Sequence, residues 1–442
     1  MYLVRHEYED ASGFKGWADQ FYRPASENEV AGILVKASRS AAPITIAGGL
    51  TGLTGGGAAQ GGVVISMERL DGIDIREGSA VCGAGVSLKD LQAAARKSRQ
   101  FFAPDPTESL ASLGGAIATN ASGSRSFRYG STARHVLALR VAFVDGSIRA
   151  FKRGEVVDFS IPSLNLPRTT KHSAGYRLKP EMDWIDLFAG SEGTLGVITQ
   201  AEVQLLPVPA ELVTGVIFFP SDAAALDAVD QWRAVPGLRM LEYCDRAALH
   251  LIGIQQEAAL LIESEDDDVE GWQRRLESSG ALIAESWIAA SDNDRERFRK
   301  LRHSLPETVH ARVRRNGFMK VGSDYAVPIE HNREMIAYYR LRMEQTLPGL
   351  YVIYGHIGDA HVHVNTMPET QQQYEQAQQL MKEFAQKAVS LGGTVAAEHG
   401  LGKRKAQLLL MQYTDAELNA MRDIKRRFDP QWLLGQGTLF GD

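Results

Sequence analysis

Glycine is concentrated in two segments of the first half of this chain, residues 48–62 and 114–123. Glycine adopts positive φ angles and lets the backbone approach a ligand closely. Successive N–H groups of such a loop can surround a pyrophosphate. No GxGxxG motif opens a helix and no GK[ST] motif is present, which excludes a Rossmann fingerprint and a P-loop. Two such loops in one domain suit an extended dinucleotide better than a mononucleotide.

The pattern of predicted secondary structure changes near residue 208. Before it, strand-like segments alternate with turns, and "HVLALRVAFVDGSIRAF" predicts a hairpin around an Asp-Gly turn. After it, strand-like "TGVIFFP" and "AALLIES" alternate with helical segments, which indicates a small α/β-sandwich domain. A long helix with an apolar stripe is predicted up to Gly392, and a capping box from Thr414 to Glu417 predicts the start of a last helix.

Length, charge and cysteine content restrict the class of protein. A chain of 442 residues is too long for one core, so two or three domains are expected. A net charge of -6 argues against a general nucleic-acid binder. With only Cys82 and Cys244, the chain cannot ligate an iron–sulfur cluster by itself. Neither a secretory signal nor a bilayer span is recognisable, so a cytoplasmic location is expected, with peripheral membrane association through a partner left open.

Three histidines, His356, His361 and His363, lie within the short segment "YGHIGDAHVHVN". A further polar pair, Glu398 and His399, lies close to the apolar segment "GGTVAA" and the glycines Gly400 and Gly402. Burying a charged group costs free energy unless it is paired, so such a pair in an apolar segment suggests a function. A single histidine is more often structural than a ligand. Two imidazoles and a carboxylate, however, form a plausible site for zinc or manganese, with room for substrate oxygens.

The motifs "GGLTGLTGG", "PDPTESLASLGGAIATNASGSRSFRYGS" and "AGSEGTLGVIT" together resemble the vanillyl-alcohol-oxidase type of FAD-binding domain. The most similar branch is the family of FAD-linked D-2-hydroxyacid dehydrogenases. This resemblance implies an α+β fold, in which a two-part FAD-binding domain is joined by a ferredoxin-like α/β-sandwich substrate or cap domain. The implied boundaries are 1–208 for the FAD-binding domain, 209–395 for the cap domain and 396–442 for a C-terminal segment that returns to the FAD-binding domain.

The resemblance also implies non-covalent FAD and a set of residues that contact it. These are Gly48, Gly49, Leu50, Thr51, Gly52, Leu53, Pro104, Thr107, Gly114, Gly115, Asn120, Ser122, Gly123, Glu192, Gly193, Gly196 and Ile198. The alternative interpretation is that the glycines only make turns.

The resemblance also implies roles for the histidine motifs. His356, His363 and Glu398 would bind a divalent metal, zinc or manganese, and His399 would be the catalytic base. Three residues would bind the substrate: Arg302, Lys320 and Asn365. Relatives usually carry asparagine where this chain has His361. We therefore interpret His361 as a structural neighbour of the site, although an exchange of ligands stays open.

The resulting hypothesis is oxidation of a small D-2-hydroxy acid, first of all D-lactate, to the 2-oxo acid. Pro306 stands where the hydroxyglutarate branch has threonine, which argues against that larger diacid. Electrons would pass to an iron–sulfur subunit or an electron-transfer flavoprotein, and a homodimer is compatible with the sequence. Two alternatives stay open: an ether-lipid-synthase-like flavoenzyme of the same fold, and a non-catalytic flavin subunit of a complex.

Overall fold

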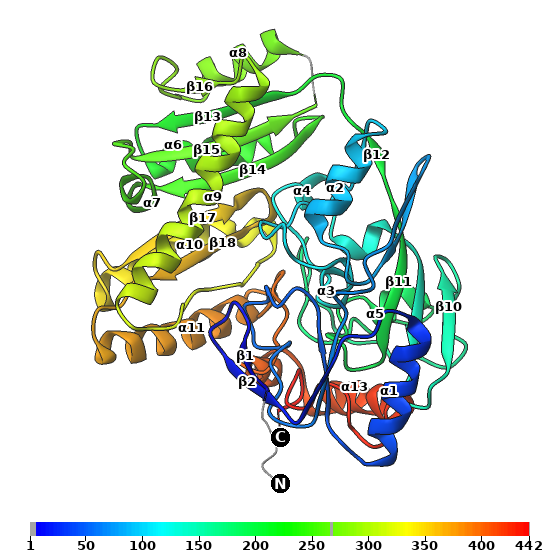
Figure 1. The fold of residues 1–442 in the computed structure, drawn as a ribbon. Helices are drawn as coiled ribbons and strands as arrows, with labels where there is room; N and C mark the ends of the chain where they lie inside the picture. The colour runs from blue at the N-terminus through cyan, green and yellow to red at the C-terminus, as the bar shows by residue number, and fades with distance from the viewer. Residues whose placement is uncertain (1–5, 266–267, 442) are drawn as a thin grey trace.

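The structure is a computed structural model that describes residues 6–265 and 268–441. It has two parts, one containing the blue and cyan elements in Figure 1 and one built on the green and yellow sheet. The first part has strands β1 (His6–Glu9), β2 (Lys15–Ala18), β3 (Gln20–Tyr22), β4 (Ile44–Ala47), β5 (Val63–Ser66), β6 (Ile73–Arg76), β7 (Ser79–Gly83), β8 (Gln100–Phe101), β9 (Val136–Ala142), β10 (Ile148–Lys152), β11 (Val197–Gln204) and β12 (Leu206–Pro207). Its helices are α1 (Glu27–Arg39), α2 (Leu88–Arg96), α3 (Leu113–Ala118), α4 (Ser126–Tyr129) and α5 (Trp184–Phe188).

The second part has strands β13 (Val213–Phe219), β14 (Leu238–Asp245), β15 (Ala258–Ser264), β16 (Trp287–Ile288), β17 (Tyr351–His356) and β18 (His361–Thr366). Its helices are α6 (Asp222–Trp232), α7 (Arg246–Leu251), α8 (Val269–Ser278), α9 (Asp292–Arg315), α10 (Asn332–Thr346) and α11 (Gln371–Ser390). Helices α12 (Leu409–Gln412) and α13 (Asp415–Phe428) follow near the C-terminus.

Two sheets organise the first part. Strands β3, β5 and β4 form a parallel sheet, and the first glycine-rich loop connects β4 to β5. The second sheet has the order β10-β9-β11-β7-β6 and is antiparallel. The predicted hairpin is confirmed as β9 and β10, and Gly146 of its turn has a φ of 85°, which glycine adopts without strain.

The second part is a six-stranded antiparallel sheet of order β16-β13-β15-β14-β17-β18. Alternate residues of a strand point to opposite faces, and β13 shows this directly. Ile217 and Phe219 pack into the main hydrophobic core with Trp232 of α6. Phe218 packs into a separate core on the other face, which Phe298 of α9 also enters. Both faces of this sheet are therefore covered by helices.

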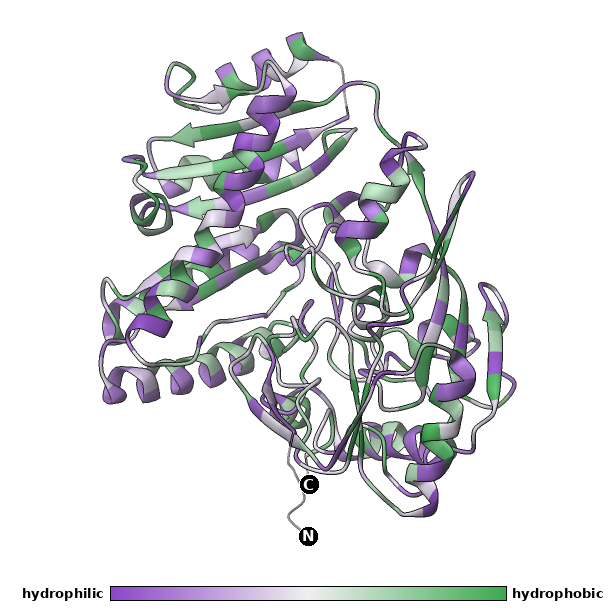
Figure 2. Cartoon of the chain, viewed as in Figure 1, coloured by the Kyte–Doolittle hydropathy of each residue, from purple (hydrophilic) through white to green (hydrophobic). Residues whose placement is uncertain are grey.

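The predicted long helix and the predicted capping box are both confirmed. Helix α11 buries Tyr374, Met381 and Phe384 along one stripe, and Figure 2 shows hydrophilic residues along its outward turns. The capping box of α13 has its reciprocal Thr414 and Glu417 contacts. Among the described residues, no helix is long and apolar enough to cross a bilayer.

After α11 the chain returns to the first part. The N–H of Ile44, in β4, donates to the carbonyl of Leu433 at 2.8 Å. The ring of Phe428, in α13, stacks on Phe143 at 5.8 Å between centroids, and α13 lies among first-part elements in Figure 1. These contacts support the three-part division that we propose, with boundaries at 208 and 395. Residues 1–5 of the first segment lie outside the described residues.

His172 joins the long segment between β10 and α5 to the returning chain. Its Nδ1 lies 2.8 Å from the Thr394 hydroxyl, and its Nε2 lies 2.9 Å from the Tyr413 hydroxyl. Burial, helped by the nearby charge of Arg177, lowers the pKa of His172 to about 3. The folded protein therefore holds this imidazole neutral.

Acid should destabilise the fold through His172. Between about pH 6.5 and pH 3 the unfolded chain binds a proton here that the folded chain does not, so stability is full above this window and falls as the pH drops through it. We expect a His172→Gln variant to lose less thermal stability than the wild type when the pH is lowered across the window. Differential scanning fluorimetry over a pH series measures this, and parallel curves for the two proteins would contradict it.

Candidate functional site

One cavity brings together both glycine-rich loops. It is lined by residues 48–54 of the first loop, by Ser112, Gly114 and Gly115 near the start of the second, and by Ser122. Glu192, Gly193, Gly196 and Ile198 line another side. The same cavity reaches the predicted metal ligand Glu398 and the predicted base His399, so these two residues share one space with most of the predicted flavin residues.

The glycines of the first loop are needed for two different reasons. A Cβ at Gly48 would lie 2.3 Å from the Ser112 Oγ, and a Cβ at Gly49 would lie 2.6 Å from the Leu110 carbonyl oxygen. Glycine at these positions lets the two loops pack against each other. A Cβ at Gly52 would meet no protein atom within 4 Å, although Gly52 lines the cavity. This open side of the backbone fits a ligand that approaches closely, as the pyrophosphate of FAD would.

Two alanine substitutions should separate loop packing from cofactor contact. Gly49→Ala forces the loops apart, so we expect both the thermal midpoint of the apoprotein and the FAD content to fall. Gly52→Ala adds a methyl group only to the open side, so we expect weaker FAD binding with an unchanged apoprotein midpoint. Flavin fluorescence titration and apoprotein melting measure the two effects. Unchanged FAD affinity in Gly52→Ala would remove that residue from the cofactor path.

The remaining predicted cofactor residues take several positions. Leu50, Thr51, Leu53 and Thr107 line the cavity, whereas Pro104, Asn120 and Gly123 do not appear in its lining. Asn120 accepts the N–H of Ala133 through its side-chain oxygen, and a Cβ at Gly123 would lie 1.8 Å from the Asp105 carbonyl. In the structure these two residues contact other parts of the protein and fix the conformation of the second loop.

Glu192 lines the cavity and also fixes the returning chain. Its carboxylate accepts the N–H groups of Leu401 at 2.9 Å and Gly402 at 2.8 Å. Burial raises the pKa of Glu192 to about 7 in spite of these two donors. The segment that carries Glu398 and His399 is thereby held against the wall of the cavity.

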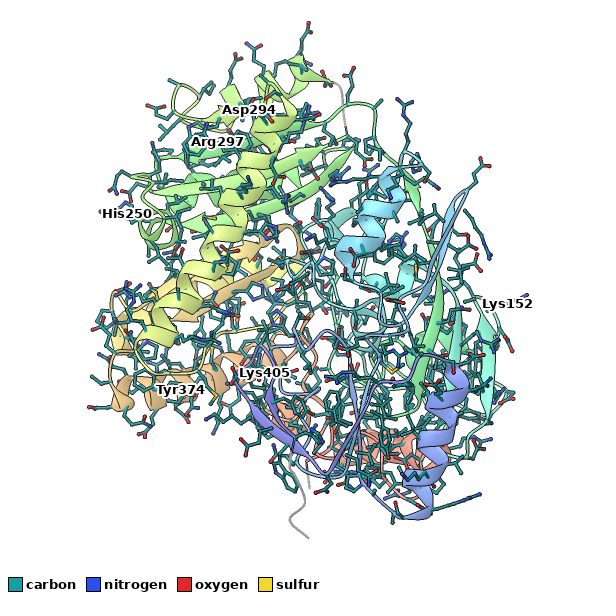
Figure 3. The ribbon with its side chains drawn as sticks, in the orientation of Figure 1. Lys152, His250, Asp294, Arg297, Tyr374 and Lys405 are labelled. Atoms are coloured by element: carbon teal, nitrogen blue, oxygen red, sulfur yellow. The ribbon has the colours of Figure 1, made fainter. Side chains whose placement is uncertain are left out.

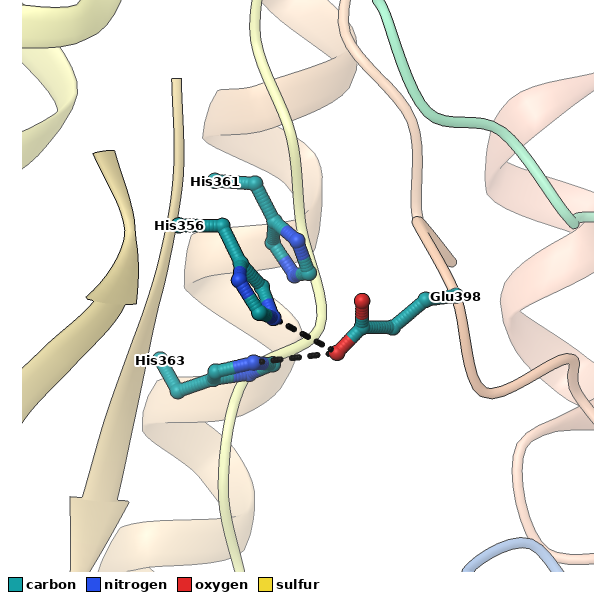
Figure 4. Close-up of side chains that lie close together, drawn as sticks. All are labelled: His356, His361, His363 and Glu398. Atoms are coloured by element: carbon teal, nitrogen blue, oxygen red, sulfur yellow. Dashed lines mark hydrogen bonds and ion pairs between the residues drawn. The ribbon is translucent and has the colours of Figure 1, made fainter. Parts of the chain in front are cut away.

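The predicted metal ligands converge at the β17–β18 hairpin, as Figure 4 shows. His356 ends β17, and His363 lies on β18 next to it. The Nε2 atoms of His356 and His363 lie 3.1 Å and 3.3 Å from Oε1 of Glu398. Two imidazole nitrogens and one carboxylate oxygen therefore face one point, and this donor set suits zinc or manganese.

Each of the two histidines also has a contact partner at its other ring nitrogen. Glu242, on the neighbouring strand β14, lies with Oε1 2.6 Å from Nδ1 of His356. The second ring nitrogen of His363 lies 3.0 Å from the carbonyl oxygen of Ser323. Desolvation alone would lower the pKa of His356, but the carboxylates of Glu242 and Glu398 raise it to about 9. Binding of a cation near pH 7 would therefore release a proton from His356.

Lys171 is a buried partner of the site that the sequence analysis missed. Its Nζ lies 3.2 Å from Oε2 of Glu398 and 3.4 Å from Oδ2 of Asp359, and it donates to the carbonyl of Gly123 at 3.2 Å. Lys171 thus occupies one oxygen of Glu398 and leaves the other for the histidines. Its segment, "KHSAGYRL", resembles a family element, and that was the only signal in the sequence.

Asp324 is a second missed residue, and it contacts the predicted base. Its Oδ2 accepts the backbone N–H of His399 at 3.0 Å and lies 3.4 Å from Nδ1 of the same residue. Nε2 of His399 points to the other side, 3.6 Å from Oε1 of Glu398. Burial lowers the pKa of His399 to about 3, although Asp324 and Glu398 oppose the shift. The imidazole is therefore neutral near pH 7.

The predicted substrate residues are brought together only in part. Arg302, on α9, donates from Nε to Oε2 of Glu242 at 2.9 Å and from Nη1 to the Thr107 hydroxyl at 3.3 Å. It therefore lies beside both the metal cluster and the cavity wall. Asn365 is buried on β18 with its Nδ2 unpartnered among the described residues. Lys320 has no ion pair in that part of the chain, and burial lowers its pKa to about 8.

Comparison with protein families identifies the scaffold. Residues 18–152 match the model described as FAD binding domain, and residues 208–439 match the model described as FAD linked oxidases, C-terminal domain. The second match alone spans more than half of the chain. The chain belongs to the FAD-linked oxidase family. The match to an FAD binding domain supports FAD as the cofactor of this FAD-linked oxidase, and we propose that the cavity between the two loops holds it.

Several relatives resemble this FAD-linked oxidase over nearly its whole length. A D-lactate dehydrogenase of Archaeoglobus fulgidus is 31% identical, with 94% of this chain and 90% of the relative covered. The glycolate oxidase subunit GlcD of Bacillus subtilis is 28% identical, with 98% and 92% covered. Among solved structures, an alkyldihydroxyacetonephosphate synthase matches with a TM-score of 0.67 at 18% identity, covering 94% of this chain and 76% of that one. That last likeness concerns the fold alone.

Proposed function

We propose that this FAD-linked oxidase oxidises a small D-2-hydroxy acid, first of all D-lactate, to the 2-oxo acid in a metal-dependent reaction. The observation that carries the proposal is the shared cavity, in which the glycine-rich loops and the pair Glu398–His399 line one space. A substrate beside the flavin would therefore also touch the metal cluster and the base. The D-lactate dehydrogenase and glycolate oxidase names of the relatives support the substrate class.

The roles of the ionisable residues follow from their positions. FAD, when bound, would accept the C2 hydride, which carries both electrons, so that only the hydroxyl proton is left for the protein. His356, His363 and Glu398 would hold a divalent cation, zinc or manganese, whose charge favours loss of the substrate hydroxyl proton. His399, neutral and oriented by Asp324, accepts that proton at its Nε2. Asn365 would hold the substrate oxygens from β18.

The substrate carboxylate needs a cation, and Arg302 is the first candidate. One edge of its guanidinium is paired with Glu242, and its Nη1 reaches Thr107 on the cavity wall. Lys320 is the second candidate. Pro306 lies one turn after Arg302 in α9, and its ring offers no side-chain donor for a second carboxylate. This favours a short monocarboxylic acid.

The decisive test mixes the FAD-loaded protein, without oxygen, with D-lactate and follows the visible absorbance of the oxidised flavin. We expect bleaching by D-lactate but not by L-lactate, loss of bleaching after chelator dialysis, and its return with zinc or manganese. Glycolate and D-2-hydroxyglutarate are compared in parallel. Bleaching that survives complete metal removal would contradict the metal role. No bleaching by any hydroxy acid would favour the ether-lipid-synthase-like or non-catalytic alternatives.

The electrons must then leave the flavin. Cys82 and Cys244 are both buried and far apart in sequence, so this chain offers no cysteine set for a cluster. We propose an external acceptor, either an iron–sulfur subunit or an electron-transfer flavoprotein, and a cytoplasmic location. Reduction of a candidate acceptor by the D-lactate-reduced protein tests this part separately.

A further inference from the structure

We propose that His361 is a fourth protein ligand of the metal, so that this chain binds the ion through three imidazoles and one carboxylate. The inference rests on the proposed metal-dependent function and deepens it, because it distinguishes zinc from manganese. Three observations carry it, namely burial, a ring nitrogen without a hydrogen-bond partner, and position.

His361 is fully buried, with 0% of its surface exposed. Nδ1 of its ring has no hydrogen-bond partner among the residues that the structure describes, and Nε2 has only the carboxylate of Asp324 nearby. A buried polar group without a partner costs free energy, and buried imidazoles in native proteins are normally satisfied. A bound cation would satisfy one nitrogen of this ring.

The hairpin places His361 in the cluster. It begins β18 directly opposite His356, which ends β17, so the two side chains are cross-strand neighbours. Its ring centroid lies 5.4 Å from that of His356 and 4.5 Å from that of His363. One ring nitrogen of each histidine and one oxygen of Glu398 all lie within 4.8 Å of one another. Figure 4 shows the rings of His361 and His356 side by side, both extending toward Glu398.

The competing interpretation is that His361 only pairs with Asp324. Nε2 of His361 lies 3.1 Å from Oδ1 of Asp324, but this contact leaves Nδ1 of the buried ring without a partner among the described residues. Asp324 is already engaged by the backbone N–H groups of Glu398 and His399. The pair therefore does not account for a fully buried histidine inside a cluster of ligands.

A third imidazole changes the expected metal. Imidazole suits zinc, copper, nickel and iron, whereas manganese favours carboxylate, carbonyl and water oxygens. Four protein ligands leave no free position on a tetrahedral ion, so substrate binding requires expansion to five ligands, which catalytic zinc sites permit. The inference therefore favours zinc over manganese and a coordination number above four with substrate bound.

The test measures metal affinity rather than activity. Wild type, His361→Asn, His363→Asn and Asp324→Asn are stripped of metal, and zinc and manganese affinities are determined by competition with a chromophoric chelator. We expect His361→Asn to lose zinc affinity by more than about 100-fold, beyond the range of about 10–100-fold typical of outer residues. Manganese affinity should fall less, by roughly tenfold or less. Asp324→Asn should stay within the outer-residue range.

A measurement on the unmodified protein removes the risk that a variant misfolds. X-ray absorption of the zinc-loaded wild type counts imidazole ligands, and three are expected. Two imidazoles, or unchanged zinc affinity in His361→Asn with normal FAD content, would overturn the fourth ligand while leaving the proposed function standing. If His363→Asn also binds zinc like the wild type, the metal role in the proposed function fails together with the inference.

Discussion

We expect the replacement of His399 with asparagine to lower the rate of flavin reduction by the proposed substrate, D-lactate, by about 10²–10⁴-fold, the usual contribution of a general base. The reason is geometric. Asp324 lies 3.4 Å from Nδ1 of His399, Nε2 lies 3.6 Å from the carboxylate of Glu398, and the residue lines the cavity. Asparagine keeps a side chain of similar length near the backbone but offers no lone pair that takes up a proton at neutral pH.

Stopped-flow reduction under anaerobic conditions measures the rate, and flavin absorbance and metal analysis verify that FAD and metal are retained. A His250→Asn variant is a matched control, because His250, on α7, lies at the outer edge of the second part in Figure 3, away from the cavity. Asp324→Asn should also lower the rate and shift the pH profile, because it removes the carboxylate that orients the imidazole of His399. Wild-type rates in His399→Asn would assign proton removal to another group.

Replacing Lys171 with methionine costs about 3–5 kcal/mol of folding free energy, the usual effect of removing one partner of a buried charge cluster. Lys171 is 2% exposed and contacts both Glu398 and Asp359. Both carboxylates are buried, and the two oxygens of Asp359 have no hydrogen-bond partner among the described residues. Without the ammonium group, Asp359 has no cation within ion-pair distance among the described residues, and Oε2 of Glu398 keeps only the Ser122 hydroxyl at 3.4 Å.

Denaturant-induced unfolding of the metal-free protein measures the loss, because a bound cation would partly replace the lysine charge. The double variant Lys171→Met, Asp359→Asn supplies the control. This variant also removes the negative charge of Asp359, one of the two carboxylates that contact Lys171. We therefore expect it to be more stable than Lys171→Met alone. If Lys171→Met unfolds at the wild-type midpoint, the carboxylates must gain protons or water instead, and the lysine has no structural role.

The sequence predicts those features that neighbouring residues determine. The Asp-Gly turn, the apolar stripe of α11 and the capping box of α13 are local patterns, and each is present in the structure. The glycine-rich loops belong to this class as well, because their small residues are adjacent in the chain. The convergence of His356, His363 and Glu398 was predicted through resemblance to a family and not through spacing alone.

Residues that act through distant partners were missed. Lys171 and Glu398 are 227 positions apart, and Glu242 and His356 are 114 positions apart. An isolated lysine, glutamate or aspartate carries no local signal that it is buried, and charged residues are usually exposed. The role of Lys320 stays a prediction from the resemblance, because no ion pair of Lys320 occurs among the described residues and its charge interacts with Asp324 and Glu398.

The return of the chain after α11 has a consequence for synthesis. Ile44 of the small parallel sheet hydrogen-bonds to Leu433, almost 400 residues later, and Glu398 and His399 also arrive with this late segment. Translation proceeds at about 5–20 residues per second. Leu433 is therefore synthesised on the order of tens of seconds after Ile44, and until then the edge strand β4 lacks this hydrogen-bond partner. A growing chain therefore lacks part of the cavity wall and one member of the His356, His363 and Glu398 cluster, and we expect a chain that stalls before the last segment to be inactive.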